Sequence, residues 1–138
     1  RNSLDSTVSL YARMDILNEV NPDLAISIHH NSVNSNANAL KANGFLALYS
    51  NNSGVLLAKT VSRTVCRQLN RYERTPSYQQ LAVARNHRFP SALFEMSFIS
   101  NIEEYQWTVT PGNYDRSAAA VVSGVLDYYR AQEAYLEY

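Results

Sequence analysis

Apolar residues recur every three or four positions in three segments of the chain, which is the spacing of an amphipathic helix. The first predicted helix is capped by Asp5 or Ser6 and ends at Asn21-Pro22. Ser53 and Asp115 are the predicted caps of the second and third helices. The apolar stripes are Leu10, Met14 and Leu17 in the first helix, Leu57, Val61, Val65 and Leu69 in the second, and Ala118, Val122, Val125 and Tyr129 in the third. We interpret all three stripes as contacts with a core.

Short apolar runs lie between the helical segments and predict β-strands. Residues 24–28 form an uncharged run that is too short for a helix, which predicts a strand buried on both faces. Further runs at 45–49, 81–84 and 92–94 predict three more strands. Because strands alternate with helices, we predict one α/β domain with a mostly parallel sheet flanked by helices on both faces.

Length and charge restrict the classes of function. The chain has 138 residues, enough for one domain, and its 12 Lys plus Arg balance 12 Asp plus Glu. A formal net charge of zero gives no long-range field, which argues against a dedicated nucleic-acid or anionic-membrane binder. No apolar run is long enough to span a bilayer. The single cysteine, Cys66, excludes an internal disulfide and a multi-cysteine metal site, and we interpret it as a core residue.

Titratable residues directly follow two of the predicted strands. The run at 24–28 leads into His29, His30 and Asn31, and the run at 92–94 leads into Glu95. Ligands of open α/β sheets gather at the carboxyl ends of strands, so His29 and Glu95 are candidates for one site. A histidine at a strand end can equally be an ordinary hydrogen-bonded polar residue. A carboxylate beside a buried run needs a partner or a function, because charged groups are rarely buried alone.

Several segments, in order along nearly the whole chain, resemble one bacterial enzyme family. Residues 23–31 read DLAISIHHN and residues 90–101 read PSALFEMSFISN. These blocks are similar to the "aDlfiSIHaN" and "PavLvEtGFlSN" segments of zinc-dependent N-acetylmuramoyl-L-alanine amidases, which hydrolyse the bacterial cell wall. Residues 1–13 and 44–49 resemble two further blocks of that family, although Leu46 stands where an acidic residue is common.

The resemblance implies a role for two residues. His29 falls on the zinc-ligand histidine and Glu95 on the catalytic glutamate, which would move the proton of a zinc-activated water. Asn31 and Arg85 are candidate substrate contacts, Arg85 for the acidic stem peptide. The implied substrate is peptidoglycan, cleaved at the amide between N-acetylmuramic acid and L-alanine. Such a protein acts outside the cytoplasm, in the periplasm, the cell wall or the medium.

The chain also departs from the family. The family's other two zinc ligands, a histidine in an N-terminal "DxGHGG" loop and a glutamate on the next helix, have no counterpart here. The remaining histidines are His30, which we place beside the site and not in it, and His87, which we expect to be exposed. Residues 1–138 therefore resemble the carboxyl-terminal two-thirds, roughly, of one amidase catalytic domain. On this interpretation the chain alone binds Zn²⁺ weakly and is inactive.

Two other functions remain open at this stage. Met96 and Ser97 replace the usual Thr and Gly after the glutamate, so the loop that follows can differ from the family's. One alternative is a catalytically dead module that binds peptidoglycan or another protein. The other is a zinc amide hydrolase or peptidase that acts on a different substrate. The oligomeric state does not follow from the sequence.

Overall fold

The computed structural model describes residues 7–34 and 39–136, which contain a four-stranded sheet with the order β1-β4-β2-β3. The strands are β1 (Ala25–Asn31), β2 (Leu46–Tyr49), β3 (Ser77–Tyr78) and β4 (Ser91–Phe98). The pairs β1–β4 and β2–β3 are parallel, and β2 runs antiparallel to β4. The sheet is therefore mostly parallel, as the alternation of strands and helices predicted.

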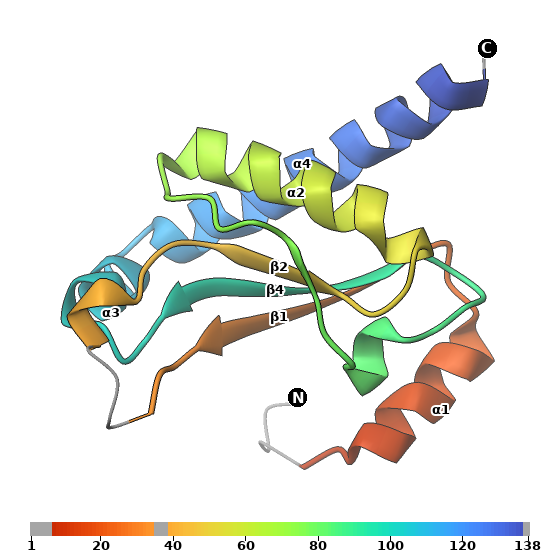
Figure 1. The fold of residues 1–138 in the computed structure, drawn as a ribbon, viewed down its shortest axis with the longest axis horizontal. Coiled ribbons are helices and arrows are strands. Elements are labelled where there is room, and N and C mark those ends of the chain that lie inside the picture. Colours follow the sequence, from red (N-terminus) through yellow and green to blue (C-terminus); the bar gives the residue numbers. More distant parts are fainter. Residues whose placement is uncertain (1–6, 35–38, 137–138) are drawn as a thin grey trace.

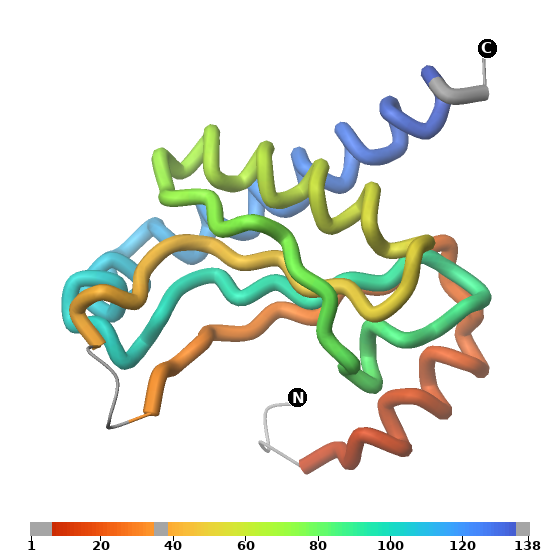
Figure 2. Tube along the Cα trace, in the orientation of Figure 1, coloured from red at the N-terminus to blue at the C-terminus, as the bar shows by residue number. Residues whose placement is uncertain are grey.

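Helices lie on both faces of this sheet. Figure 1 shows α2 and α4 side by side over one face, with α1 and a short 3₁₀ helix, η2, toward the other. Figure 2 follows the chain from β4 through α3 into α4. The helices are α1 (Leu10–Val20), η1 (Ala39–Lys41), α2 (Ser53–Leu69), η2 (Ala82–Ala84), α3 (Ile102–Val109) and α4 (Asn113–Leu136). The predicted α/β class with covered faces is confirmed.

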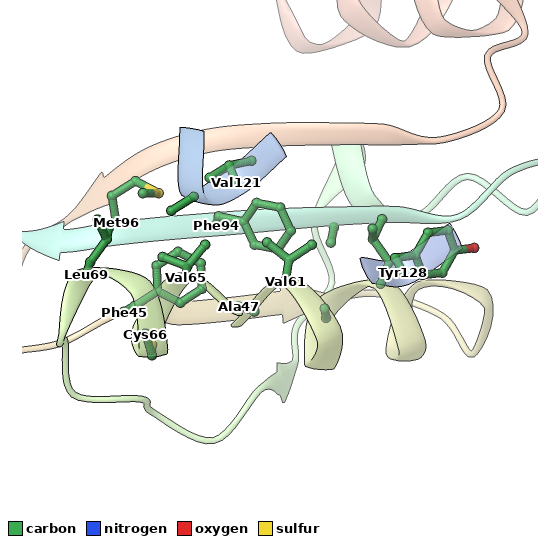
Figure 3. Close-up of a cluster of buried hydrophobic side chains, with 14 residues drawn as sticks. Phe45, Ala47, Val61, Val65, Cys66, Leu69, Phe94, Met96, Val121 and Tyr128 are labelled. Atoms are coloured by element: carbon green, nitrogen blue, oxygen red, sulfur yellow. The ribbon is translucent and has the colours of Figure 1, made fainter. Parts of the chain in front are cut away.

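The main core lies between the sheet and the α2–α4 layer. Phe45, directly before β2, and Phe94 of β4 have ring centroids 5.7 Å apart, and Val61 and Val65 of α2 belong to the same buried cluster (Figure 3). All four residues of the predicted α2 stripe are buried. Burial of apolar side chains contributes roughly 25 cal/mol per Å², so this layer supplies most of the driving force for folding.

The predicted apolar stripe of α4 is correct at Val125, which packs against the core, and wrong at Ala118, Val122 and Tyr129, which are exposed. Val122 is 59% exposed, whereas its neighbour Val121 is buried together with Tyr128. The reason is Gly124, because a Cβ atom there would lie 2.9 Å from the Cα of Val61 on α2. The helix places Gly124 against α2, which allows the two helices to approach closely. The buried side of α4 is therefore shifted by one residue, so that Val121 and Tyr128 are buried in place of Val122 and Tyr129. Hydrophobic spacing carries no signal for such a contact.

The first helix ends where it was predicted to end and begins at a different cap. Ser9 is the N-cap of α1, and its Oγ accepts a hydrogen bond of 3.1 Å from the amide of Ala12. The predicted caps Asp5 and Ser6 lie outside the described residues. At the other end, Asn21 adopts the left-handed conformation with φ 46°, which terminates the helix directly before proline.

The predicted caps of the other two helices both lie inside the helix, Ser53 directly after the N-cap Asn52 of α2 and Asp115 as the third residue of α4. Ser53 is the first helical residue of α2, and the side chain of Asn51 accepts the hydrogen bond from the amide of Gly54 at 3.1 Å. Asp115 lies in the first turn of α4, which begins at Asn113. A carboxylate in a first turn still interacts favourably with the helix dipole, so Asp115 correctly indicates the start of a helix but not its first residue.

Two predictions for the strands need correction. Residues 24–28 do form most of β1, but β1 is an edge strand, and Ile26 and Ile28 are 37% and 54% exposed. The run at 81–84 forms η2 and not a strand, and the strand in that region is the short β3. No helix in the described part of the chain is long and apolar enough to cross a membrane.

Candidate active site

The sheet register brings His29 and Glu95 together. β1 and β4 run in parallel, and the Cα of His29 is paired with the Cα of Glu95 near the carboxyl ends of both strands. Paired residues on neighbouring strands project to the same face, so the two side chains share one side of the sheet. This is the face opposite the main core, toward α1 and η2.

Glu95 has a carboxylate oxygen without a partner. Its Oε2 is buried and has no hydrogen-bond partner among the described residues. Burial raises the pKa of the Glu95 carboxyl, and the charge of His29 opposes that shift only in part. An unpaired buried carboxylate is unfavourable for folding, which points to a functional use.

His29 opens into a cleft on this face. The cleft has a volume of about 720 Å³ and is lined by side chains of β1 and β4 together with Arg13 and residues 80–83 around η2. Ser27 and Leu93 line it together with His29. Glu95, Asn31 and Arg85 are not among its lining residues. The cleft therefore reaches His29, and Glu95 is paired with His29 on the neighbouring strand without lining the cleft.

His30 points to the other face of the sheet. Its Nδ1 is hydrogen bonded to Oγ of Ser97 at 2.8 Å, and that oxygen is hydrogen bonded to Oγ1 of Thr108 at 2.8 Å. Burial, and then the charge of His29, lower the pKa of His30. Successive strand residues alternate between faces, so His29 and His30 are not directed at one ion. The sequence did not indicate the chain of hydrogen bonds through Ser97 and Thr108.

Asn31 contributes to the order of the chain that follows His29. Its side-chain oxygen accepts a hydrogen bond of 2.8 Å from the amide of Ser32. Its backbone carbonyl accepts another, of 2.9 Å, from the amide of Ile99 after β4. A β-bulge occurs between His29 and Asn31, which re-aims the strand at the point where it leaves the sheet.

The chain beyond Glu95 is held by a buried amide that the sequence analysis did not single out. Asn101 is 1% exposed, and its Nδ2 donates to the carbonyls of Leu40 and Ala42 at 3.2 and 3.0 Å. Its Oδ1 accepts from the amide of Glu103 and so caps α3. The only sign of this cap in the sequence is an asparagine followed closely by two acidic residues, a pattern typical of a helix start.

A buried ion pair supports the same end of β4. Glu104 accepts hydrogen bonds from the amides of Gly44 and Phe98 and from the guanidinium of Arg71. Arg71 also lies over the ring of Trp107, with 4.2 Å from its guanidinium carbon to the ring centroid. Glu104 on α3 therefore links the end of β4, through Phe98, to the residues before β2 and after α2.

The other candidate residues lie away from this pair. Arg85 follows η2 and is exposed, and His87 is exposed as predicted. Cys66 is buried in the main core, and burial raises its pKa to about 12. The cysteine is therefore a core residue, as its position in the second predicted helix indicated.

The described residues do not make a complete zinc site. A catalytic zinc has three protein ligands and one open position. In the part of the chain that the structure describes, no three His, Cys, Asp or Glu side chains are grouped to hold a metal ion. His29 and the unpartnered oxygen of Glu95 have the right chemistry for one ligand and one proton acceptor, but a complete zinc site does not fit these residues alone.

Comparison with known proteins identifies the family. The pattern described as N-acetylmuramoyl-L-alanine amidase matches residues 1–127. The chain belongs to the N-acetylmuramoyl-L-alanine amidase family. Its sequence is 30% identical over 135 residues to an uncharacterized cell wall amidase of Bacillus anthracis. The aligned region covers 94% of this chain but only 25% of that relative. The chain thus spans about a quarter of the length of this curated relative.

Solved structures of amidases have the same fold. An N-acetylmuramoyl-L-alanine amidase from Clostridium difficile 630 is similar with a TM-score of 0.83 and 29% identity. The amidase AmiC2 of Nostoc punctiforme is similar with a TM-score of 0.83 and 28% identity. Each similarity covers 91% of this chain and 68% of the other. These similarities agree with the resemblance to amidases that was based on the segments containing β1 and β4.

Proposed function

We propose that this chain forms part of a hydrolase that cleaves the amide between N-acetylmuramic acid and L-alanine in peptidoglycan. Family membership supports the reaction class. The observation that carries the proposal is the pairing of His29 with Glu95 on adjacent parallel strands, with Oε2 of Glu95 buried and unpartnered. Because peptidoglycan lies outside the cytoplasmic membrane, the protein acts there.

Glu95 is the proposed proton carrier. A carboxyl whose pKa is raised by burial can accept a proton and later release it nearer to neutral pH than an exposed carboxyl can. Glu95 would take a proton from the attacking water and deliver it to the nitrogen of the leaving L-alanine. The firm support of the end of β4 by Asn101 and Glu104 keeps this carboxylate in place.

His29 is the proposed metal ligand of this chain. A zinc ion bound to it in the complete site would supply a water of lowered pKa. Asn31 and Arg85 are proposed substrate contacts, Asn31 through the loop that it orders and Arg85 through the carboxylates of the stem peptide. Arg85 lies beyond the cleft beside His29, so a stem peptide would leave the cleft across η2 to reach it.

The chain is, in this proposal, the carboxyl-terminal two-thirds, roughly, of one catalytic domain. Three observations support it. The similar amidase structures are covered to 68% of their length. The metal donors among the described residues are incomplete. The edge strand β1 leaves Ile26 and Ile28 exposed, although strands with two isoleucines normally lie inside a sheet.

A second candidate is a catalytically dead module that binds peptidoglycan. The incomplete donor group among the described residues favours it for this chain taken alone. The unpartnered carboxylate of Glu95 favours the hydrolase, because a binding module has no need of it.

One experiment tests the proposed hydrolase. The chain is completed on its amino-terminal side with the sequence encoded there and is incubated with a purified muropeptide and zinc. We expect release of free stem peptide with L-alanine at its amino end, detected by mass spectrometry. Binding of the muropeptide without its cleavage supports the dead module instead. Cleavage at a bond inside the stem peptide identifies a peptidase and overturns the proposed substrate bond.

A further inference from the structure

A ridge of basic side chains runs along the outer surface of α2. Lys59, Arg63 and Arg67 are four residues apart and all are exposed. Four residues of an α-helix rise by about 6 Å and turn slightly more than once, so the three side chains stand in a row on one side of the helix. We call these three residues the basic ridge.

The basic ridge borders a groove between α2 and α4. The groove has a volume of about 380 Å³, and its lining includes the three basic side chains and one acidic residue, Asp127. Asp127 already accepts a hydrogen bond of 2.8 Å from Thr64 and one of 2.9 Å from Arg130. These contacts, with Arg67 at 3.9 Å, lower the pKa of Asp127 and keep it charged.

The charges at this groove do not cancel. One carboxylate, Asp127, lines the groove together with the three cations of the ridge, and this carboxylate is already paired with Arg130. Among the described residues, Lys59 and Arg63 form no ion pair, and Arg67 has only the long contact with Asp127. Net charge over the chain is zero, so this excess is a local feature that acts at contact range and gives no long-range attraction.

We propose that the basic ridge binds a linear polyanion that carries phosphate or carboxylate groups along a flexible chain. A row of cations at steps of about 6 Å fits anionic groups repeated along a polymer. Guanidinium groups, two of the three here, bind both phosphate and carboxylate in a bidentate manner.

The surroundings of the basic ridge favour this partner over two others. No exposed large apolar residue lies on α2, whereas a helix that enters a membrane surface needs such residues beside its cations. No aromatic residue lines the groove, whereas single-stranded nucleic acids are held by stacking on aromatic rings.

The location makes this binding independent of the proposed catalysis. The α2–α4 layer covers the sheet face opposite the one that carries His29 and Glu95 (Figure 1). A polymer on the basic ridge would leave the cleft open. In a wall that contains such a polymer, attachment would raise the local concentration of the protein near its substrate without any contact with the cleft.

The test measures binding of labelled poly(glycerol phosphate) to residues 1–138 by fluorescence anisotropy over a range of salt concentrations. We expect binding at low salt that weakens as salt rises. The logarithm of the association constant should fall with the logarithm of the salt concentration at a slope of roughly −2 to −3 for three or four phosphate contacts. Replacing the ridge by Lys59→Gln, Arg63→Gln and Arg67→Gln should weaken binding by about a hundredfold at low salt. Arg63→Glu alone should weaken binding of the polymer by about tenfold. This single variant provides the test if the triple variant fails to fold.

The control removes the same charge elsewhere. Lys41→Gln, Arg88→Gln and Arg116→Gln change three exposed residues outside the groove and should leave binding within a factor of about three. Equal loss in both triple variants, or no binding by the unmodified chain, overturns the proposal. Binding of poly-L-glutamate in parallel tells whether the ridge accepts carboxylates as well as phosphates. Tighter binding to phosphatidylglycerol vesicles or to a single-stranded oligonucleotide than to either polymer also overturns it.

Discussion

Glu95 has surroundings that are unfavourable for a carboxylate and useful for a proton carrier. One oxygen is buried without a partner, and the nearest charge is the paired His29. Protein interiors normally satisfy such an oxygen with a hydrogen bond, because an unsatisfied polar group costs about 1–3 kcal/mol. A residue that retains this cost beside a histidine at a strand end is a strong candidate for chemistry.

Substitution of Glu95 should separate proton transfer from metal binding. In the completed domain, we expect Glu95→Gln to lower turnover by ~10²–10⁴-fold, because an amide cannot accept the proton of water. Zinc content should stay nearly unchanged. His29→Ala should lose both zinc and activity, because it removes a ligand. The measurements are muropeptide cleavage and metal analysis of the same protein samples. Loss of zinc in Glu95→Gln equal to that in His29→Ala would make Glu95 a ligand and contradict the assigned roles.

A stability measurement on residues 1–138 distinguishes a functional Glu95 from a structural one. Glu95→Gln removes a buried charge that has no hydrogen-bond partner on Oε2. We therefore expect the free energy of unfolding in urea to be unchanged or raised by about 1 kcal/mol. A decrease of 2 kcal/mol, roughly, would show that the carboxylate holds the fold together, which is the usual result for a satisfied buried charge.

Cys66 should be unreactive in the native protein. Its thiol is buried in the core, and its pKa is raised to about 12. Since the thiolate is the reactive form, labelling by a disulfide reagent at pH 8 should be roughly a thousandfold slower than for an exposed thiol. The rate of colour release on reaction with that reagent checks this. Unfolding in guanidinium should restore the ordinary rate, and rapid labelling of the native protein would contradict the burial of the thiol.

At the scale of elements, the two strands that carry the candidate site were readable from the sequence. Each is an apolar run that ends in a titratable residue, and parallel strands bring such ends together. Strand alternation then separates His29 from His30, which the sequence allows once β1 is known. The hydrogen bond from His30 to Ser97, and the one that continues from Ser97 to Thr108, could not be predicted, because these partners lie 67 and 78 positions after His30, on β4 and α3.

The elements that were predicted wrongly depend on tertiary contacts that have no local signal. The stripe of α4 is set by the approach of Gly124 to Val61, and a glycine carries no hydrophobic periodicity. Residues 81–84 are apolar enough for a strand, but the hydroxyl of Ser50 accepts a hydrogen bond of 3.0 Å from the amide of Leu81 and the segment turns into η2. In both cases a contact with a residue far away in the sequence decides the local structure.

The contact between α4 and α2 predicts a specific effect of Gly124→Val. A Cβ at this position would lie 2.9 Å from the Cα of Val61, so the helices must move apart. We expect a loss of ~1–3 kcal/mol in the free energy of unfolding, measured in urea. Ala119→Val on the same helix is the matched control, because Ala119 is exposed and should change stability by no more than about 0.5 kcal/mol. Equal effects of the two substitutions would mean that helix propensity alone is responsible.

At the scale of the whole molecule, the edge strand β1 and the helix α4 both expose apolar side chains. Ile26 and Ile28 are exposed on the edge strand β1, and Val122 and Leu126 are exposed on α4. Ile28 and Val121 line a small groove of about 130 Å³ between these two elements. Exposed apolar residues that occur singly need no explanation, but an apolar sheet edge beside an apolar helix face is typical of a buried interface. The incomplete metal donors include His29 on the same edge strand.

These two features lead to one prediction about zinc and stability. If the proposed amino-terminal third covers the β1 edge and brings the other two ligands, completing the domain should increase zinc affinity and folding stability together. One imidazole cannot enclose a zinc ion, so residues 1–138 should bind zinc weakly in a calorimetric titration. The completed domain should bind at least a thousandfold more tightly and unfold at a higher temperature when zinc is added, by the linkage between binding and folding.

His29→Ala in the completed domain should abolish the zinc-dependent part of the stabilisation and keep the part that comes from covering Ile26 and Ile28. Tight zinc binding by residues 1–138 alone would contradict this division and would require His30 or His87 as an additional ligand. Because His30 faces the other side of the sheet and His87 is exposed, such a result would also mean that the bound state has a different arrangement of β1.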